Sequence, residues 1–565
     1  MIVEAFAQLQ QQVLQLQQPR GRMHDLLRHK HSSTLPTAEE QVTLPLHSKP
    51  VPVIDPDRLR ARMSPSQRDR WDELWRLLTT PPATPETHVP PGTFSVAHAT
   101  KMVDDGIITR LTTADLHARP TKAGGIAFTV KEEKDEHFRL RAIYWPKRLN
   151  DAVRRVYTAR MNLRHVASYL DRVRDECAAI GDLSISFYQV EIPSWARAWF
   201  RFTDARGTLY EMNRLPMGFC PSAEIMQLLT ETLAGCPHAV ATPQLASHHT
   251  SPDVWIDGFR VAGARPAVTA ALRKIVEAAR DINATFKEPP TVAVRYDFIG
   301  VHNNHTQHTV RVADKTRKKL PRKMRDHMKV TQLATLTSRL IFAGAVVRAP
   351  LARFYFALKW TNRLVSAINN SPAHEDVDVT IPRGLKAIFN NWLKAARSTH
   401  TLPPTTQPRD AERDILYTDA SSHGHGAVLF LASGEIAITG GAWPASTDTS
   451  PGNMAALEAA SARIGVATFA DRLLMRRNFE HRIDNTSAQS ALARGIARAA
   501  SVNEQVAPIL EWVRSNDVTY TVSRVDTDHN WADKPSRGQR LTRAEVLPPS
   551  TYESRGAGSR VARSG

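Results

Sequence analysis

Residues 415–430 read ILYTDASSHGHGAVLF, a strand-like run through Asp419 whose glycine-rich continuation suits a hairpin. Three further acidic residues follow on a predicted helix, a strand end and a final helix: Glu458 in NMAALEAASARIGVATF, Asp484 in FEHRIDN and Asp533 in DHNWADKPSR. A compact α/β fold can place four such carboxylates around a pair of divalent metal ions. Any one Asp is more often a helix cap or a turn residue, so the argument depends on the set.

Two more carboxylates occur far upstream, in segments with strand-like patterns. Asp182 lies in GDLSISFYQVEIPSWARAWFRF, where an aromatic pair and alternating apolar residues follow it. Asp257 lies in DVWIDGFRVAG, where Gly258 favours a tight turn between strands. Nucleotidyl transfer with two divalent metals needs carboxylates in such places. Asp257 could also be a plain turn residue.

Composition and charge limit the class of protein. The chain has 565 residues, enough for several domains, and Lys+Arg 74 against Asp+Glu 56 gives a net charge of +18. This indicates a polyanionic partner, although ribosomal and membrane-surface proteins are also basic. The three cysteines have no zinc-site spacing and indicate a reducing, intracellular setting, the cytoplasm or nucleus. No signal peptide or membrane span is apparent, so we expect no membrane partner.

The chain divides by composition into seven parts with an α+β, multidomain organisation. From the pattern of helices, strands and Pro-rich breaks alone, the parts are an N-terminal helix, a Pro-rich linker with a short helix, two α+β segments, a helical segment, an α/β segment and a disordered basic tail. Their residues are 1–30, 31–95, 96–165, 166–310, 311–400, 412–540 and 541–565.

The last α/β segment resembles the ribonuclease H domain of retroelements. YTDAS, the helical Glu458, RIDNTSA and NWADKPSR occur in the order and spacing of that family. The resemblance implies that Asp419, Glu458, Asp484 and Asp533 are catalytic metal ligands for two Mg²⁺ or Mn²⁺ ions. It also implies that the RNA strand of an RNA–DNA hybrid is the substrate.

The region upstream resembles a retroelement reverse transcriptase, a right-hand polymerase with fingers (96–165), palm (166–310) and thumb or connection (311–400). Asp182 and Asp257 match its two-metal carboxylates, and Phe187 matches the aromatic residue that excludes a 2′-hydroxyl. LPMGFCPSAEIMQ, with Met217 and Gly218, matches the family's segment that packs against the incoming nucleotide and the template base. The resemblance implies an RNA template, a DNA primer and deoxynucleoside triphosphates as partners.

Three cations complete the expected nucleotide site. GIAFTVKEEKDEHFRLRAIYWPKRLND resembles the fingers hairpin, with Arg141 and more loosely Lys131 as clamps for the triphosphate. Lys287, in DINATFKEPPTVAVRYDFIGV, matches a lysine near the leaving pyrophosphate. Taken singly, each could be a solvated surface charge, and Phe187 could be core packing.

The palm departs from the family at one position. The family's turn reads aromatic-x-Asp-Asp, whereas this chain has Trp255-Ile256-Asp257-Gly258 and lacks the second Asp. Three hypotheses therefore stay open: an active reverse transcriptase with ribonuclease H, a ribonuclease H with a degenerate palm, and a non-catalytic nucleic-acid-binding subunit.

The helical segment resembles the thumb and connection of tyrosine-recombinase retrotransposons, including those of trypanosomes. The segment TQLATLTSRLIFAGAVVRAPLARFYFALKW carries this resemblance. Basic residues such as Lys315 and Arg317 could contact the phosphate backbone of a hybrid. They could also form a solvent-exposed charged face with no ligand. No aspartic-protease or integrase motif is present, so we expect one piece or reading frame of a larger element. Self-association or partners from the same element are possible.

Overall fold

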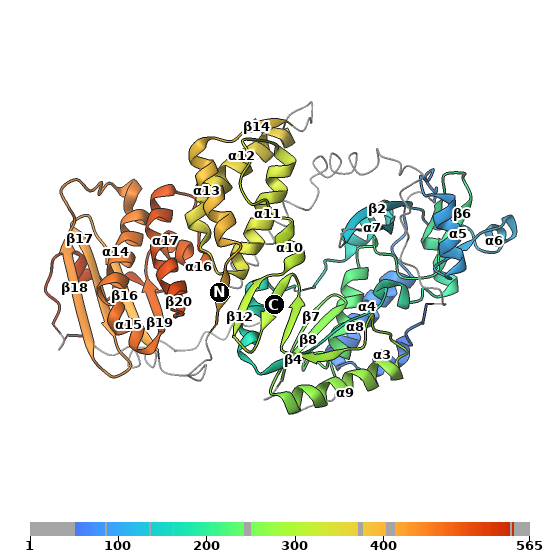
Figure 1. Cartoon of the computed structure of the whole chain (residues 1–565), viewed down its shortest axis with the longest axis horizontal. Coiled ribbons are helices and arrows are strands. Elements are labelled where there is room, and N and C mark those ends of the chain that lie inside the picture. The colour runs from blue at the N-terminus through green and yellow to red at the C-terminus, as the bar shows by residue number, and fades with distance from the viewer. Residues whose placement is uncertain are drawn as a thin grey trace. The chain divides into compact units, whose positions relative to one another are not determined.

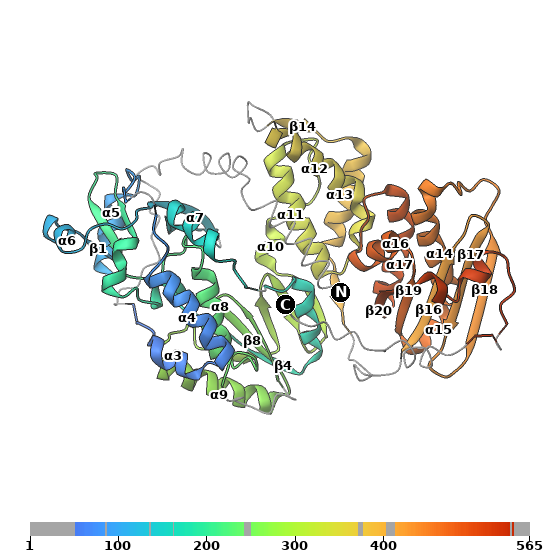
Figure 2. The same ribbon diagram turned by 180° about the vertical axis from the view of Figure 1, so that it is seen from behind.

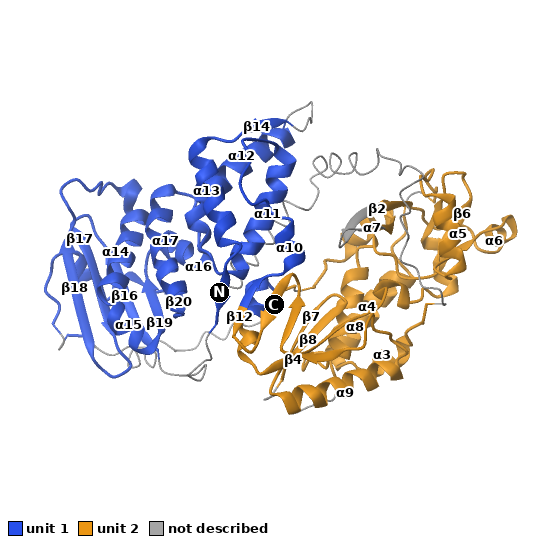
Figure 3. Ribbon diagram, in the orientation of Figure 1, with its two compact units in different colours: residues 1–24, 164–170, 310–565 blue, residues 25–163, 171–309 orange. Residues whose placement is uncertain are grey.

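A computed structural model describes residues 51–84, 87–134, 137–161, 163–241, 250–370, 377–402, 413–542 and 545–546. The helix expected over 1–30 lies outside these residues. The chain forms two compact units (Figure 3): unit 2 contains residues 25–163 and 171–309, and unit 1 contains residues 1–24, 164–170 and 310–565. The mixed helix and sheet content expected from the sequence is confirmed. The finer division into fingers, palm and thumb remains a prediction.

The first described segment contains the short helix expected within 31–95 and a second helix before it. From residue 51 the chain forms α3 (Pro56–Arg62) and α4 (Pro65–Thr79), each with a proline in its first turn. Proline suits that position because its missing N–H would be unpaired there anyway. Asp55 and Ser64 cap the two helices. Several apolar residues of this segment belong to the unit 2 core: Ile54, Leu59, Met63, Trp71, Leu74 and Leu78.

A four-stranded antiparallel sheet in the order β7-β8-β4-β9 is central to unit 2. Its strands are β4 (Cys177–Asp182), β7 (Thr250–Trp255), β8 (Gly258–Gly263) and β9 (Thr291–Ala293). Helices α8 (Ser222–Leu233) and α9 (Arg265–Asp281) pack against it (Figure 1). Small side chains of β4, namely Cys177 and Ala179, meet Val268 and Ile275 of α9 in a buried cluster. This sheet carries both acidic positions expected in the palm.

Smaller elements complete unit 2. Strands β2 (Ile126–Lys134) and β3 (His137–Trp145) form an antiparallel hairpin, and β1 (Ile108–Arg110), β6 (Leu209–Met212) and β5 (Arg201–Thr203) form a three-stranded sheet. β10 (Arg295–Phe298) pairs with β11 (Val301–Asn304). The remaining helices are α5 (Val96–Asp104), α6 (Thr113–Ala118), α7 (Lys147–Val156), η2 (Ser186–Gln189) and η3 (Ser194–Trp199); η1 (Val166–Arg174) and β12 (Thr309–Val312) span the change of unit.

From residue 314, unit 1 forms a mainly helical region. Its elements are α10 (Asp314–Lys318), β13 (His327–Lys329), α11 (Val330–Val346), η4 (Leu351–Phe354), α12 (Tyr355–Asn370), β14 (Asp378–Thr380), α13 (Arg383–Ala395) and β15 (Thr399–Thr401). Trp392 is fully buried and stacks on Phe354, with ring centroids 4.6 Å apart. A Cβ added to Gly344 would lie 3.2 Å from the Trp392 indole nitrogen, so α11 approaches this ring closely.

The C-terminal part of unit 1 is a five-stranded sheet in the order β18-β17-β16-β19-β20. The strands β16, β19 and β20 run parallel, while β17 and β18 are antiparallel to their neighbours. Their bounds are β16 (Asp414–Ala420), β17 (Gly424–Phe430), β18 (Ile436–Ala442), β19 (Asn478–Ile483) and β20 (Thr519–Arg524). Its helices are η5 (Pro451–Asn453), α14 (Met454–Thr468), α15 (Ala470–Arg476), α16 (Thr486–Arg494), α17 (Ala500–Ser515), η6 (Thr527–His529) and α18 (Asp533–Ser536).

The two faces of this sheet have separate cores. Leu416 and Leu429 face a cluster formed with α14, α16 and α17, helices that lie together beside the sheet in Figures 1 and 2. Tyr417 and Phe430, on the alternate positions, pack in a second cluster with Ala532. The expected alternation of strands and helices therefore buries both faces.

The start of the expected disordered tail is packed. Leu541 and Val546 are 9% and 5% exposed and belong to the second cluster of the sheet. This corrects the tail boundary at 541, because these apolar residues find a surface on the sheet that composition does not reveal. The rest of the tail, from residue 547, lies outside the described residues. Among the described helices none is long and apolar enough to cross a membrane.

Candidate active site

Three of the four carboxylates expected in the C-terminal domain converge. Asp419 is the penultimate residue of β16, Asp484 directly follows β19, and Glu458 lies in the first turns of α14. Because β16 and β19 are parallel neighbours, their carboxyl ends meet at one edge of the sheet. Each of the three residues offers a carboxylate oxygen within 4.8 Å of the others. We call these residues the acidic cluster.

Asp419 is held from both sides by polar side chains. Asn530 Nδ2 donates to Asp419 Oδ1 at 3.1 Å and also to the Thr418 carbonyl at 3.2 Å. The Ser536 hydroxyl donates to Asp419 Oδ2 at 2.5 Å. Ser421 in turn donates to the Ser536 carbonyl at 2.6 Å. The carboxylate therefore has a fixed orientation, a requirement for a metal ligand.

Among the acidic cluster, the pKa of Glu458 is shifted furthest from its ordinary value. Its side chain is 4% exposed, and its Oε2 has no hydrogen-bond partner. Burial, with a smaller contribution from the charges of Asp419 and Asp484, raises the pKa of Glu458 to about 9. Burial likewise raises the pKa of Asp419 to about 6. A buried, unpartnered carboxylate oxygen beside two other acids is what a divalent cation would satisfy.

Asp533 differs from the other three. It is not in the group within 4.8 Å, and both of its carboxylate oxygens accept from Arg537 Nε, at 2.9 and 3.0 Å. The sequence assigned it the same role as the other three acids, but the structure pairs it with a cation one helical turn away. Its place as a metal ligand stays a prediction, which we revise below.

Two glycines allow the elements around the acidic cluster to approach closely. A Cβ on Gly426 of β17 would lie 2.4 Å from the Ala532 carbonyl oxygen and 2.6 Å from the Ser536 nitrogen, which leaves no room for a side chain. A Cβ on Gly465 of α14 would meet Thr418 at 2.8 Å. The missing side chains therefore let α18 pack closely on β17 and α14 pack closely on β16, the strand that carries Asp419.

The backbone of unit 2 places Asp182 beside Asp257. The Leu183 amide donates to the Asp257 carbonyl at 3.0 Å, and Asp182 pairs with Gly258 in the β4–β8 register. The Lys287 amide donates to the Asp182 carbonyl at 2.9 Å, and the Lys287 side chain is exposed. Asp257 Oδ2 accepts from the Ser186 hydroxyl at 2.8 Å. Two acids and one lysine expected in one site therefore lie on adjoining backbone segments.

The turn that carries Asp257 is strained and tethered. Ile256 has φ 56°, a left-handed conformation that is unfavourable for a β-branched residue. Its amide donates to Gln227 Oε1 at 2.7 Å, and Gln227 Nε2 reaches the Val254 carbonyl at 3.4 Å. Gln227 is 5% exposed on α8. Strain held in place by a buried side chain is often found at functional sites.

Phe187 lies on η2, half-buried against the unit 2 core. The turn before it is held by Gln189, which donates to the Ser184 and Thr285 carbonyls at 2.5 and 2.9 Å and accepts from the Thr285 amide. Gln189 therefore joins the segment after Asp182 to the segment before Lys287.

The remaining expected residues of the nucleotide site lie around β3. A Cβ on Gly218 would lie 2.0 Å from the Tyr144 carbonyl oxygen, so this glycine is required for close backbone packing. Met217 is half-buried against the core, and Arg141 is exposed on β3. The side chain of Lys131 lies outside the described ones.

Several residues that orient the acids escaped sequence interpretation. Gln189, Gln227 and Ser536 are polar residues in apolar or helical contexts, where their partners cannot be inferred from spacing. Asn530 and Ser536 both lie within NWADKPSR, and Gln227 ends LPMGFCPSAEIMQ, but neither motif indicates that these side chains orient the acids. Each is identified by a hydrogen bond that the tertiary structure creates.

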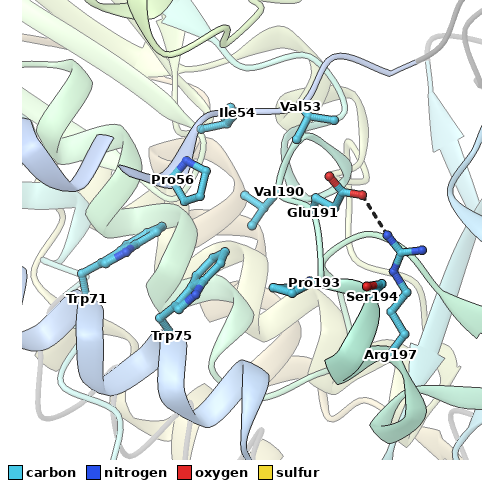
Figure 4. A pocket seen from close by; sticks show the side chains of 10 residues that line it. All are labelled: Val53, Ile54, Pro56, Trp71, Trp75, Val190, Glu191, Pro193, Ser194 and Arg197. Carbon is cyan, nitrogen blue, oxygen red and sulfur yellow. Dashed lines mark hydrogen bonds and ion pairs between the residues drawn. The ribbon is translucent and has the colours of Figure 1, made fainter. Parts of the chain in front are cut away.

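A cavity of about 280 Å³ lies elsewhere in unit 2, between the segment before α3, α4 and η3. Trp71 and Trp75 stack along one wall, with ring centroids 5.4 Å apart (Figure 4). The opposite wall carries Glu191, which accepts from Arg197 at 2.8 Å. The cavity shows that the N-terminal segment forms part of the body of unit 2.

Comparisons with known proteins add little. No protein-family model matches the chain, and no curated protein matches it. Solved structures of a foamy viral protease-reverse transcriptase are similar at 13% identity. The form described as dRH, in complex with double-stranded DNA, has a TM-score of 0.47 over 87% of this chain and 84% of that chain. The complexes with double-stranded DNA and with an RNA/DNA hybrid both have TM-scores of 0.44, over 85% and 87% of this chain and 99% and 65% of theirs. Such low values leave the function to be inferred from this chain's own residues.

Proposed function

We propose that the chain is a retroelement ribonuclease H joined to a polymerase, and that the C-terminal domain hydrolyses the RNA strand of an RNA–DNA hybrid. The observation that carries this is the acidic cluster. Its carboxylates come from a strand end, a helix and a neighbouring strand end, in the sequence order of the resemblance. Three converging acids, one of them buried with one carboxylate oxygen unpartnered, favour a cation site over a solvated surface.

Asp419, Glu458 and Asp484 would hold Mg²⁺ or Mn²⁺. Oxygen ligands of this kind suit both ions. When bound, the divalent cations lower the pKa of an attacking water and stabilise charge on the phosphate. The cation would also favour the ionised form of Glu458, whose pKa burial otherwise raises.

The chain's own residues orient these ligands. Ser536 and Asn530 donate to the two oxygens of Asp419. These bonds hold the Asp419 side chain in one rotamer before a metal binds. Ser461 donates to the Asp419 carbonyl at 2.6 Å and ties α14, which carries Glu458, to β16. Selectivity for RNA would come from contacts to the 2′-hydroxyl and the shape of the hybrid.

Hybrid cleavage by the full chain tests this proposal. A fluorescent RNA–DNA hybrid should be cut with Mg²⁺ or Mn²⁺ in the RNA strand only, and duplex DNA should be spared. Asp419→Asn should lower cleavage by orders of magnitude, while Asp528→Asn, an exposed acid on η6, should leave it unchanged. Cleavage that survives Asp419→Asn, or no cleavage with either metal, would refute the proposal.

A second activity, RNA-directed DNA polymerisation, is favoured by a separate observation. Asp182, Asp257 and Lys287 lie on adjoining backbone segments of one sheet edge. Under this proposal the two acids would hold the catalytic metals, and Lys287 and Arg141 would meet the triphosphate. Met217, Gly218 and Phe187 would contact the nucleotide.

Primer extension on an RNA template distinguishes the polymerase from a degenerate palm. Asp182→Asn should abolish extension and leave hybrid cleavage intact, because the acidic cluster belongs to the other unit. Asp419→Asn should have the reverse effect. A wild-type chain that cleaves hybrids but extends no primer would support the degenerate palm, and one with neither activity the non-catalytic subunit.

A further inference from the structure

The Asp533–Arg537 pair leaves most of the guanidinium unused. Only Nε of Arg537 contacts Asp533, and within the described part of the chain the two Nη groups make no hydrogen bond. The Arg537 side chain is 51% exposed and that of Asp533 31%. Four N–H donors therefore have no hydrogen-bond partner among the described residues, on a half-exposed side chain that is held at its Nε end.

Arg537 also lies next to the acidic cluster. It directly follows Ser536, whose hydroxyl contacts Asp419 Oδ2, and consecutive Cα atoms are about 3.8 Å apart. Gly426 lets the α18 backbone approach β17 so closely that this position is fixed by packing. Arg537 therefore places a positive charge directly after the residue that contacts Asp419.

We propose that Arg537 binds a backbone phosphate of the nucleic-acid strand beside the acidic cluster, and that Asp533 positions Arg537 and is not a ligand of the resting metal site. This rests on the proposed ribonuclease H function and replaces the metal-ligand role expected for Asp533. A guanidinium with its Nε fixed presents its Nη groups to phosphate oxygens in a bidentate manner. A polyanion approaching three carboxylates also requires compensating positive charge.

A surface ion pair four residues apart on a helix contributes little stability, so a purely structural role predicts small effects of substitution. The binding role predicts a specific loss. Arg537→Gln should weaken binding of an RNA–DNA hybrid about tenfold and lower the slope of log affinity against log salt by about one. Arg537→Lys should keep the salt slope and lose part of the affinity, because the charge remains and the bidentate geometry does not.

The measurement is fluorescence anisotropy of a labelled hybrid with the full chain, in Ca²⁺, across a salt series. Lys534→Gln is the matched control, since Lys534 lies on α18, which Arg537 directly follows, and pairs with Glu545 at 3.4 Å. Cleavage kinetics in Mg²⁺ should show a raised KM and a nearly unchanged kcat for Arg537→Gln. Asp533→Asn should give the same KM effect.

Metal binding separates the two roles of Asp533. Titration of Mn²⁺ alone, followed by calorimetry, should show wild-type affinity for Asp533→Asn and a large loss for Asp419→Asn. Loss of Mn²⁺ affinity in Asp533→Asn, or an unchanged salt slope in Arg537→Gln, would overturn the inference. A wild type that binds hybrid through Arg537 without cutting it would overturn the ribonuclease proposal and leave the phosphate site standing.

Discussion

Gly258 faces Asp182 across the β4–β8 ladder, and a Cβ built on Gly258 would lie 3.7 Å from Asp182 Oδ1. This is ordinary van der Waals contact, and the φ of Gly258 is not in the left-handed region. The backbone would therefore accept a side chain here, and a carboxylate at this position would join Asp182 and Asp257.

Gly258→Asp should raise primer extension about tenfold or more, equivalent to about 1.4 kcal/mol. The reason is that a third carboxylate beside Asp182 and Asp257 would strengthen metal binding. Extension rates at several Mg²⁺ concentrations measure the effect. Gly258→Asn is the control of equal size, and an equal gain from Asn would show that charge is not the cause.

Gln227→Ala should lower primer extension without affecting hybrid cleavage. Loss of the 2.7 Å bond from the Ile256 amide would release a turn that holds a left-handed isoleucine, and Asp257 would lose its fixed position. Extension and cleavage assayed on one preparation give the comparison. Gln227→Glu keeps an acceptor for Ile256 and should be milder; equal loss in both variants would point to the bonds donated by Nε2 instead.

Metal-free protein should lose stability as pH rises. Glu458 has a folded pKa near 9 and an ordinary value of 4.5, so its contribution is fully present below pH 4.5 and is lost as pH rises toward 9. Asp419 adds a loss between 3.8 and about 6. Each group contributes at most about 1.4 kcal/mol per pH unit within its window.

Urea unfolding in EDTA at pH 5, 7 and 9 measures this dependence. Glu458→Gln should flatten it, and added Mg²⁺ should restore stability at high pH in the wild type but not in the variant. A wild type as stable at pH 9 as at pH 5 without metal would contradict the buried position of Glu458.

Because of His481, we expect folding stability to fall with decreasing pH in the acid range. The ring is fully buried between the Thr418 hydroxyl at 2.8 Å and the Tyr520 hydroxyl at 2.9 Å, and burial lowers its pKa to about 3. Stability contributed by the neutral ring is present above pH 6.5 and is lost as pH falls toward 3. His481→Gln should reduce this loss, as measured by unfolding between pH 4 and 7; an unchanged acid dependence would assign the loss to other groups.

Local patterns in the sequence were sufficient to predict much of the C-terminal domain. The apolar run before Asp419, the helix around Glu458 and the strand that ends before Asp484 were each predicted close to their observed bounds. Strand and helix periodicity are properties of neighbouring residues, so they can be read from the chain. The short helix predicted within 31–95 corresponds to α4, whereas α3 was missed, because proline in a first helical turn and proline in a linker look alike in composition.

The sequence by itself determined which acids occur and on which elements, since periodicity places Asp419 in a strand, Glu458 in a helix and Asp484 at a strand end. Only the tertiary structure decided how each carboxylate is used. Asp419 accepts hydrogen bonds from Ser536 and Asn530. Glu458 is buried and its Oε2 has no partner, whereas Asp533 forms an ion pair with Arg537. The physical reason is that hydrogen bonds and desolvation depend on which side chains meet in space. Contacts between residues more than 100 positions apart, such as Asp419 with Ser536, leave no periodic signal in the chain.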